Sequence, residues 1–269
     1  MSATTRTLSQ ADPELVLRDD RDGVAWLTLN RPQQLNALSK AMLEALQQTI
    51  DAIAHDPAVR VVVIGGAGKA FCSGHDLKEM RASREQGAIQ ALFEQCSRMM
   101  LAIQQMPQPV IARVHGIATA AGCQLVAMCD LAVAAEDARF AVSGINVGLF
   151  CSSPGVALSR NLGRKQALEM LLSGDFIDAR AAQERGLVNR VVPLDRLDAE
   201  IDRLAATLVA KSPVAIATGK RMFYKQLELG IEAAYAYAAE VMACNMLAED
   251  AAEGIDAFIQ KRPAKWRGR

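Results

Sequence analysis

Two stretches of the sequence place small residues where a buried strand gives way to a helix. They are GGAGKAFCSGHDLKEM at residues 65–80 and HGIATAAGCQLVAMCD at residues 115–130. Small side chains let a ligand approach the backbone closely, and the first turn of a helix has N–H groups without partners inside the helix. Two such helix starts that face each other could direct two N–H groups at one oxygen atom, as in an oxyanion hole. Tight packing between helix and strand would give the same composition, and composition alone favours that second interpretation.

Strand and helix patterns alternate along the chain as far as residue 193. Two β-branched runs, at residues 59–66 and 110–114, are typical of strands that are buried on both faces. The segment 39–56 has apolar residues at helical spacing, and Ser39 can cap its N-terminus. Alternating units of this kind predict an α/β fold in which most strands pair in parallel.

Further residues mark the boundaries of the elements. Asp22-Gly23 predicts a turn between the first two strands, and Asn161 and Asp178 are the expected N-caps of two later helices. Ser212-Pro213 predicts another helix start. From about residue 194 the pattern is helical throughout, so we expect a C-terminal region that packs on a neighbouring subunit.

Composition excludes several classes of protein. The 269 residues are 51% hydrophobic and carry 30 basic and 30 acidic side chains, a balance that argues against nucleic acid as the main partner. No apolar run reaches the roughly 20 residues that a membrane span needs. The N-terminus has no apolar signal-peptide core, so we expect a cytoplasmic protein with a flexible tail at residues 1–12. The six cysteines form no CxxC pair, which favours free thiols over zinc or disulfides, and no metal site is expected.

The two loop stretches, together with LNRPQQLNAL at residues 29–38, resemble the enoyl-CoA hydratase/isomerase (crotonase) family. The likeness continues at residues 167–193 and 253–266 and covers nearly the whole chain. It implies an α/β, crotonase-like spiral of ββα turns at residues 13–193 and a helical oligomerisation region at residues 194–269. It also implies assembly as a homotrimer or homohexamer. Within the family, the pattern is most similar to the enoyl-CoA hydratase domain-containing protein 3 subgroup.

The resemblance also implies which residues form the site. The backbone N–H groups of His75 and Ala121 match the oxyanion hole that polarises the thioester carbonyl of an acyl-CoA. The positions implied to bind CoA are Asn36, Ala37, Leu38, Ser73, Asp76, Leu77, Phe258 and Lys261. The first three would line the CoA entrance, whereas Phe258 and Lys261 would reach the ligand of a neighbouring subunit. No permanently bound cofactor is implied, because coenzyme A arrives as part of the substrate.

The sequence departs from the family pattern at both catalytic glutamates. Gln124 stands at the first position, and Gly144, within FAVSGINVG, stands at the second. An amide can orient a water molecule but cannot exchange its proton near neutral pH. We therefore expect a slow hydratase, and glutamates restored at both positions should raise the rate of hydration. A non-catalytic or regulatory acyl-CoA-binding hexamer and an acyl-CoA decarboxylase or thioesterase are the alternatives, so whether the protein is an enzyme stays open.

Other polar side chains near these positions could also do chemistry. The imidazole of His75 could act as a base near neutral pH, or it could point away and brace its loop. Ser143, Asn146, Cys151 and Ser152 follow the second lost glutamate closely and could hold water, act as nucleophiles or simply line the site. Cys151 would need a lowered pKa to react, and no basic residue adjoins it in the sequence.

Overall fold

The computed structural model describes residues 14–82 and 84–269, so the tail predicted at residues 1–12 lies outside the described part. A six-stranded sheet with the order β1-β2-β3-β4-β6-β9 forms the centre of the molecule. Only β1 and β2 pair antiparallel, and the other neighbours in this sheet are parallel, as the sequence predicted. The strands are β1 (Val16–Arg21), β2 (Val24–Leu29), β3 (Val61–Gly66), β4 (Val110–Val114), β6 (Leu131–Ala135) and β9 (Arg190–Val192).

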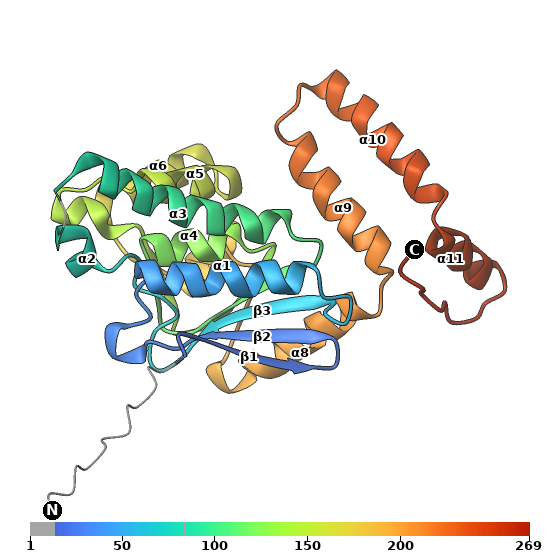
Figure 1. The fold of residues 1–269 in the computed structure, drawn as a ribbon, viewed down its shortest axis with the longest axis horizontal. Coiled ribbons are helices and arrows are strands. Elements are labelled where there is room, and N and C mark those ends of the chain that lie inside the picture. Colours follow the sequence, from blue (N-terminus) through green and yellow to red (C-terminus); the bar gives the residue numbers. More distant parts are fainter. Residues whose placement is uncertain (1–13, 83) are drawn as a thin grey trace, which may run out of the picture.

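A smaller sheet and most of the helices cover one face of this sheet. The small sheet has the order β5-β7-β8 and consists of β5 (Ile117–Thr119), β7 (Arg139–Ala141) and β8 (Ile177–Asp178). The helices before the last strand are α1 (Lys40–Ala54), α2 (Leu77–Ala82), α3 (Gln86–Gln105), α4 (Ala121–Met128), α5 (Ser152–Asn161), α6 (Arg164–Ser173) and α7 (Ala179–Glu184). Short 3-10 helices lie at Pro32–Gln34, Ser143–Val147 and Leu194–Arg196. Figure 1 shows α1 and α3 running across the sheet on the same side.

The opposite face of the sheet is covered by α8 (Leu197–Val209). Its buried residues Leu197 and Ile201 pack in a cluster with Val61, Ile111 and Val133 from three parallel strands. This explains why β3 and β4 are apolar on both faces, since each is buried between two helical layers. The division predicted after residue 193 follows the last strand, but α8 packs as part of the body of the molecule.

Most of the predicted boundaries are confirmed. Asp22 and Gly23 have φ values of 52° and 76°, which suit a tight hairpin turn. Ser39, Asp178 and Ser212 each cap a helix, because each side chain accepts a hydrogen bond from the backbone N–H three residues further on.

The prediction for Asn161 was wrong. Asn161 is the last residue of α5, and Gly163 is the N-cap of α6. The Asn161 amide instead donates hydrogen bonds to the carbonyl oxygens of Ala127 (3.0 Å) and Ala157 (2.9 Å). It therefore satisfies carbonyl groups of the preceding helices rather than N–H groups of the following one.

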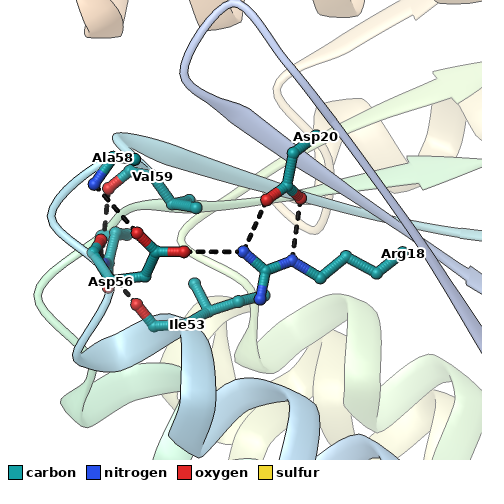
Figure 2. A network of polar contacts seen from close by, with 7 residues as sticks. Arg18, Asp20, Ile53, Asp56, Ala58 and Val59 are labelled. Carbon is teal, nitrogen blue, oxygen red and sulfur yellow. Dashed lines mark hydrogen bonds and ion pairs between the residues drawn. The ribbon is translucent and has the colours of Figure 1, made fainter.

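A cluster of ionic contacts ties the β1–β2 hairpin to the end of α1 (Figure 2). Arg18 donates to both carboxylate oxygens of Asp20, at 2.8 and 2.6 Å, and to Asp56 at 2.9 Å. The other oxygen of Asp56 accepts the backbone N–H of Ala58 at 3.0 Å. These side chains are near the surface, so each contact contributes little to stability and the cluster mainly fixes the direction of the chain.

The C-terminal helices α9 (Pro213–Gln226), α10 (Ile231–Met246) and α11 (Glu249–Ile259) extend away from the sheet (Figure 1). One buried cation fixes α9 to the body. Lys220 Nζ donates to the carbonyl oxygens of Ile103 and Gln108, both at 2.8 Å, and to Asp130 at 2.7 Å. Burial lowers the pKa of Lys220, and Asp130 opposes this effect. None of the described helices is long and apolar enough to cross a bilayer.

Candidate functional site

The two small-residue loops predicted from the sequence lie in direct contact. The backbone N–H of Thr119 donates to the carbonyl oxygen of Cys72 at 3.0 Å. A Cβ atom added to Gly74 would lie 2.8 Å from Ala120 Cβ and 3.2 Å from Ala121 N, and one added to Gly122 would collide with the carbonyl oxygen of Cys72. Glycine at these two positions is therefore what lets the two backbones approach each other.

The N–H groups of His75 and Ala121 donate no hydrogen bond to any other described residue. On each side of His75 the chain pairs with Leu38, through Leu38 N to Gly74 O (2.7 Å) and Asp76 N to Leu38 O (3.3 Å). Ala121 is the first residue of α4, where N–H groups have no intrahelical partner, and it follows Ala120 with its positive φ of 51°. The structure thus brings together the two loops whose donors the resemblance assigned to an oxyanion hole, and that role stays a prediction.

A cavity of about 310 Å³ opens between these loops and the segment that leads into α5. Its lining consists of Ser73, His75, Leu77, Met80, Phe93, Ala120, Ala121, Ser143, Gly144, Val147, Leu149, Phe150, Cys151, Ser152, Ser153 and Pro154. Among these described residues there is no aspartate, glutamate, lysine or arginine. Several apolar side chains are exposed there, Leu77 by 60% and Val147 by 67%.

The side chain of His75 is partly buried. Its ring packs edge-to-face against Phe93, with the ring centres 5.4 Å apart, and Nδ1 is buried without a hydrogen-bond partner among the described residues. Burial lowers the pKa of His75, while the backbone of Leu38 and the carboxylate of Glu79 act in the opposite direction. The ring is therefore neutral at pH 7.

The two positions of the lost glutamates differ in their surroundings. Gln124 is 4% exposed and does not line the cavity, and its Oε1 atom has no hydrogen-bond partner among the described residues. Gly144 lines the cavity, but a Cβ atom there would lie 2.5 Å from the carbonyl oxygen of Leu149 and 2.7 Å from Cys151 Sγ. We expected that glutamates at both positions would restore hydration. A side chain at position 144 would force Leu149 or Cys151 to move, so the geometry counts against this expectation, which stays untested.

The predicted CoA-binding residues near the loops fall into two groups. Ser73 and Leu77 line the cavity, whereas the side chains of Asn36, Ala37 and Leu38 are buried. Asn36 Nδ2 donates to the carbonyl oxygens of residues 67, 70 and 71 at 2.9, 2.8 and 3.2 Å. The Asn36 side chain therefore holds the loop in shape, and any contact of these three buried residues with CoA would involve their backbone.

Asp76 supports the same loop. It accepts a hydrogen bond from Arg31 at 2.8 Å and another from the backbone N–H of Lys78 at 3.0 Å. The Arg31 guanidinium is the main reason why the pKa of Asp76 is lowered. This carboxylate stays charged at neutral pH, and it does not line the cavity.

Phe258 and Lys261 lie in the C-terminal region, apart from the cavity of their own chain. Phe258 is 85% exposed near the end of α11, and Lys261 follows that helix with a φ of 53°. Figure 1 shows α11 at the far end of the molecule from α2 and α5. The predicted contact of these two residues with the ligand of a neighbouring subunit stays a prediction.

Sequence reasoning missed Met80 and Phe93 as cavity residues. Both lie on helices, Met80 on α2 and Phe93 on α3. Burial raises the pKa of the Cys151 thiol, which argues against a nucleophilic role. Within residues 14–82 and 84–269, no group of three or more His, Cys, Asp or Glu side chains could hold a metal ion.

Comparison with known proteins shows the family to which the chain belongs. The family model described as Enoyl-CoA hydratase/isomerase matches residues 19–269. Enoyl-CoA hydratase domain-containing protein 3, mitochondrial, from Xenopus laevis is 46% identical over 257 residues, which are 96% of this chain and 87% of that protein. The protein of the same name from Mus musculus is 44% identical over 258 residues, or 96% of this chain and 86% of that protein.

A solved structure shows the same fold. The crystal structure of an enoyl-CoA hydratase from Mycobacterium smegmatis is 60% identical, superposes with a TM-score of 0.92, and covers 94% of this chain and 98% of that one. The names of the Xenopus and mouse relatives contradict the cytoplasmic localisation predicted from the sequence, because both are named mitochondrial. The match over nearly the whole chain, in sequence and in fold, shows that this protein has the crotonase fold and belongs to the enoyl-CoA hydratase/isomerase family.

Proposed function

We propose that the protein binds an acyl-CoA thioester and polarises its carbonyl group between the N–H groups of His75 and Ala121. The observation that carries this proposal is a pair of N–H groups that lack partners among the described residues, on two touching loops, beside a cavity whose described lining is uncharged. Donors fixed in this way stabilise the negative charge that develops on the thioester oxygen when an enolate forms. One such donor contributes on the order of 10²–10³ in rate.

The nearest reaction in the family is the hydration of a 2-enoyl-CoA, and we propose that it is slow here. Hydration requires a group that takes a proton from water and a group that delivers one to the α-carbon. No carboxylate among the described residues lines the cavity to do either. Each missing acid–base group costs roughly 10²–10⁴ in rate.

Calorimetry with a non-hydrolysable acyl-CoA analogue tests the binding step. We expect saturable binding, and no detectable heat at millimolar ligand would overturn the proposal. The assay for hydration uses crotonyl-CoA. A kcat on the order of 10²–10³ s⁻¹, in the upper part of the usual enzyme range, would show that hydration is not slow.

Decarboxylation of a malonyl-type CoA thioester is a second candidate, favoured by the uncharged lining. A carboxylate moved from water into such a cavity loses solvation, and loss of CO₂ transfers its negative charge to the thioester oxygen of the enolate. The electron pair left behind would form the enolate that the two N–H groups stabilise. A panel of 2-enoyl-, 3-enoyl- and malonyl-type CoA thioesters distinguishes this reaction from hydration and isomerisation. Binding without turnover of any of them would indicate a regulatory acyl-CoA-binding protein.

We also propose that the protein is a homotrimer or homohexamer with its C-terminal helices at the subunit contacts. Large apolar side chains on and between these helices are unusually exposed: Tyr235 (73%), Met242 (72%), Leu247 (88%), Phe258 (85%) and Ile259 (70%). Surfaces of this kind mark contacts between proteins. Light scattering should give the mass of three or six chains, and a monomer at micromolar concentration would overturn the proposal.

A further inference from the structure

We propose that the imidazole of His75 transfers the proton at the α-carbon of the bound acyl-CoA. This inference rests on the proposed function, because it assigns the acid–base group of that same site. It gives His75 two roles: the backbone N–H stabilises the thioester oxygen and the side chain moves the proton.

The composition of the cavity leaves few candidates for this task. A general base must exchange a proton near neutral pH. Among the described lining residues, only His75 and Cys151 have side chains whose ordinary pKa lies near neutral pH. Burial raises the pKa of the Cys151 thiol, so the thiolate is scarce at neutral pH. The imidazole is the group that remains.

The packing of the ring supports the same assignment. Phe93 holds the ring edge-to-face, and the planes of the two rings meet at 84°. Nδ1 is buried and makes no hydrogen bond within the described chain. An atom without accessible surface cannot meet a ligand, so the ring nitrogen that exchanges the proton is Nε2.

The chemical step balances without a further reactant. Neutral imidazole takes the proton from the α-carbon, and the electron pair of the C–H bond becomes the enolate. The negative charge on the thioester oxygen is held by the N–H groups of His75 and Ala121. The imidazolium then returns a proton to the α-carbon, which restores both partners.

The charges around His75 set the pH at which the base is available. Burial lowers its pKa, and the backbone of Leu38 and the Glu79 carboxylate on α2 oppose this effect. Asp76 on the same loop is paired with Arg31, and no charged side chain lines the cavity in the described chain. Neutral imidazole therefore predominates down to a pH below 6.5, the ordinary histidine value.

The experiment follows exchange of the α-hydrogens of butyryl-CoA for deuterium in D₂O, by mass spectrometry of the full-length protein's reaction mixture. This exchange needs only the oxyanion donors and a base, whichever complete reaction the protein catalyses. We expect His75→Gln to slow exchange by about 10²–10⁴-fold. Calorimetry should show that this variant still binds butyryl-CoA. His55→Gln, on the exposed end of α1 where Nδ1 contacts Asp51, is the matched control and should exchange as the wild type does.

A second measurement needs no variant and covers the case in which His75→Gln does not fold. The exchange rate of the wild type should rise with pH and level off below pH 6.5, because the base form is then complete. Exchange at the wild-type rate in folded His75→Gln would overturn the proposal. So would a plateau only above pH 8, or loss of exchange in Cys151→Ser alone. A wild type that binds butyryl-CoA without exchange overturns the role of His75 but not the binding function, whereas a wild type that does not bind overturns both.

Discussion

The cavity has two walls that differ in how closely they are packed. The inner wall, residues 72–75 and 119–122, accepts no added atom at Gly122, where a methyl group would collide with a carbonyl oxygen. The outer wall, residues 143–153, has open space around Gly148 and exposes 67% of Val147. The tight wall holds the donors that any acyl-CoA reaction of this kind requires. The outer wall is open near Val147 and Gly148 but tight at Gly144, the position of one of the lost glutamates.

The largest expected effect comes from breaking the inner wall. Gly122→Ala should lower the free energy of unfolding by about 3 kcal/mol, because the added methyl group forces two backbones apart. It should also abolish binding of the acyl-CoA analogue in calorimetry. Gly219→Ala is the matched control, because Gly219 lies in α9 with nothing within 4 Å of its added Cβ. In urea unfolding, the control should gain about 0.5–1 kcal/mol in the free energy of unfolding. An equal loss of stability in both variants would contradict the proposed difference between the two walls.

The tight base of the outer wall gives the next effect. Gly144→Glu should lower stability by about 1–3 kcal/mol, since its Cβ meets Leu149 and Cys151. Combined with Gln124→Glu, it should hydrate crotonyl-CoA no faster than the wild type. Thermal melts must precede the rate measurements so that unfolded protein is not counted as inactive. A gain of about 100-fold in the folded double variant would show that the outer wall can rearrange.

Substitutions at the open part of the outer wall should change ligand affinity more than they change the stability of the fold. Phe150 lines the cavity and is 43% exposed, so Phe150→Ala should cost less than about 1 kcal/mol of stability. The wider cavity should alter the Kd for long acyl-CoA chains relative to short ones by up to about tenfold. Calorimetry over a series of chain lengths measures the change. A stability loss as large as that of Gly122→Ala would remove the distinction between the walls.

Thiol labelling reports the same contrast without any substitution. Burial raises the pKa of Cys72, within the inner wall, and of Cys123, beside it, to about 12. Cys151 in the outer wall is 7% exposed and also has a raised pKa. With iodoacetamide at pH 8, exposed Cys244 should react first, Cys151 slowly and the two inner thiols last. The rates of the three thiols with raised pKa should rise with pH as thiolate forms. Peptide mass spectrometry that finds Cys72 labelled as fast as Cys151 would contradict this order.

Local patterns predicted much of the fold. Ser39 and the apolar face of α1, the doubly buried β3 and the hairpin turn at Asp22-Gly23 are all encoded within a few neighbouring residues. The two loops of the inner wall were found in the same way, because small residues after a strand are a local signal. Contacts between distant segments were not predictable. Asn161 bonds to Ala127, 34 positions earlier, and this contact overrides its local preference for capping.

The same limit applies to the candidate site. Asn36 lies within a family motif, yet only the folded chain shows that its amide binds three carbonyl groups and does not face the cavity. The lack of space at Gly144 depends on Leu149 and Cys151, which the chain brings back through a 3-10 helix and the turn that follows. The identity of the side chains could therefore suggest the chemistry. The space available at a position such as Gly144 depends on tertiary packing and could not be predicted from the sequence.

The late position of β9 and α8 in the chain has a consequence for biosynthesis. Until residue 190 has emerged from the ribosome, β6 is an unpaired edge strand, because its outer neighbour in the sheet is β9. Until residue 209 has emerged, the apolar face formed by Val61, Ile111 and Val133 lacks the helix that covers it. For most of translation, the nascent chain thus exposes both an unpaired strand edge and an uncovered apolar surface. Slower synthesis at reduced temperature, or a chaperone that shields this face, should raise the yield of soluble protein.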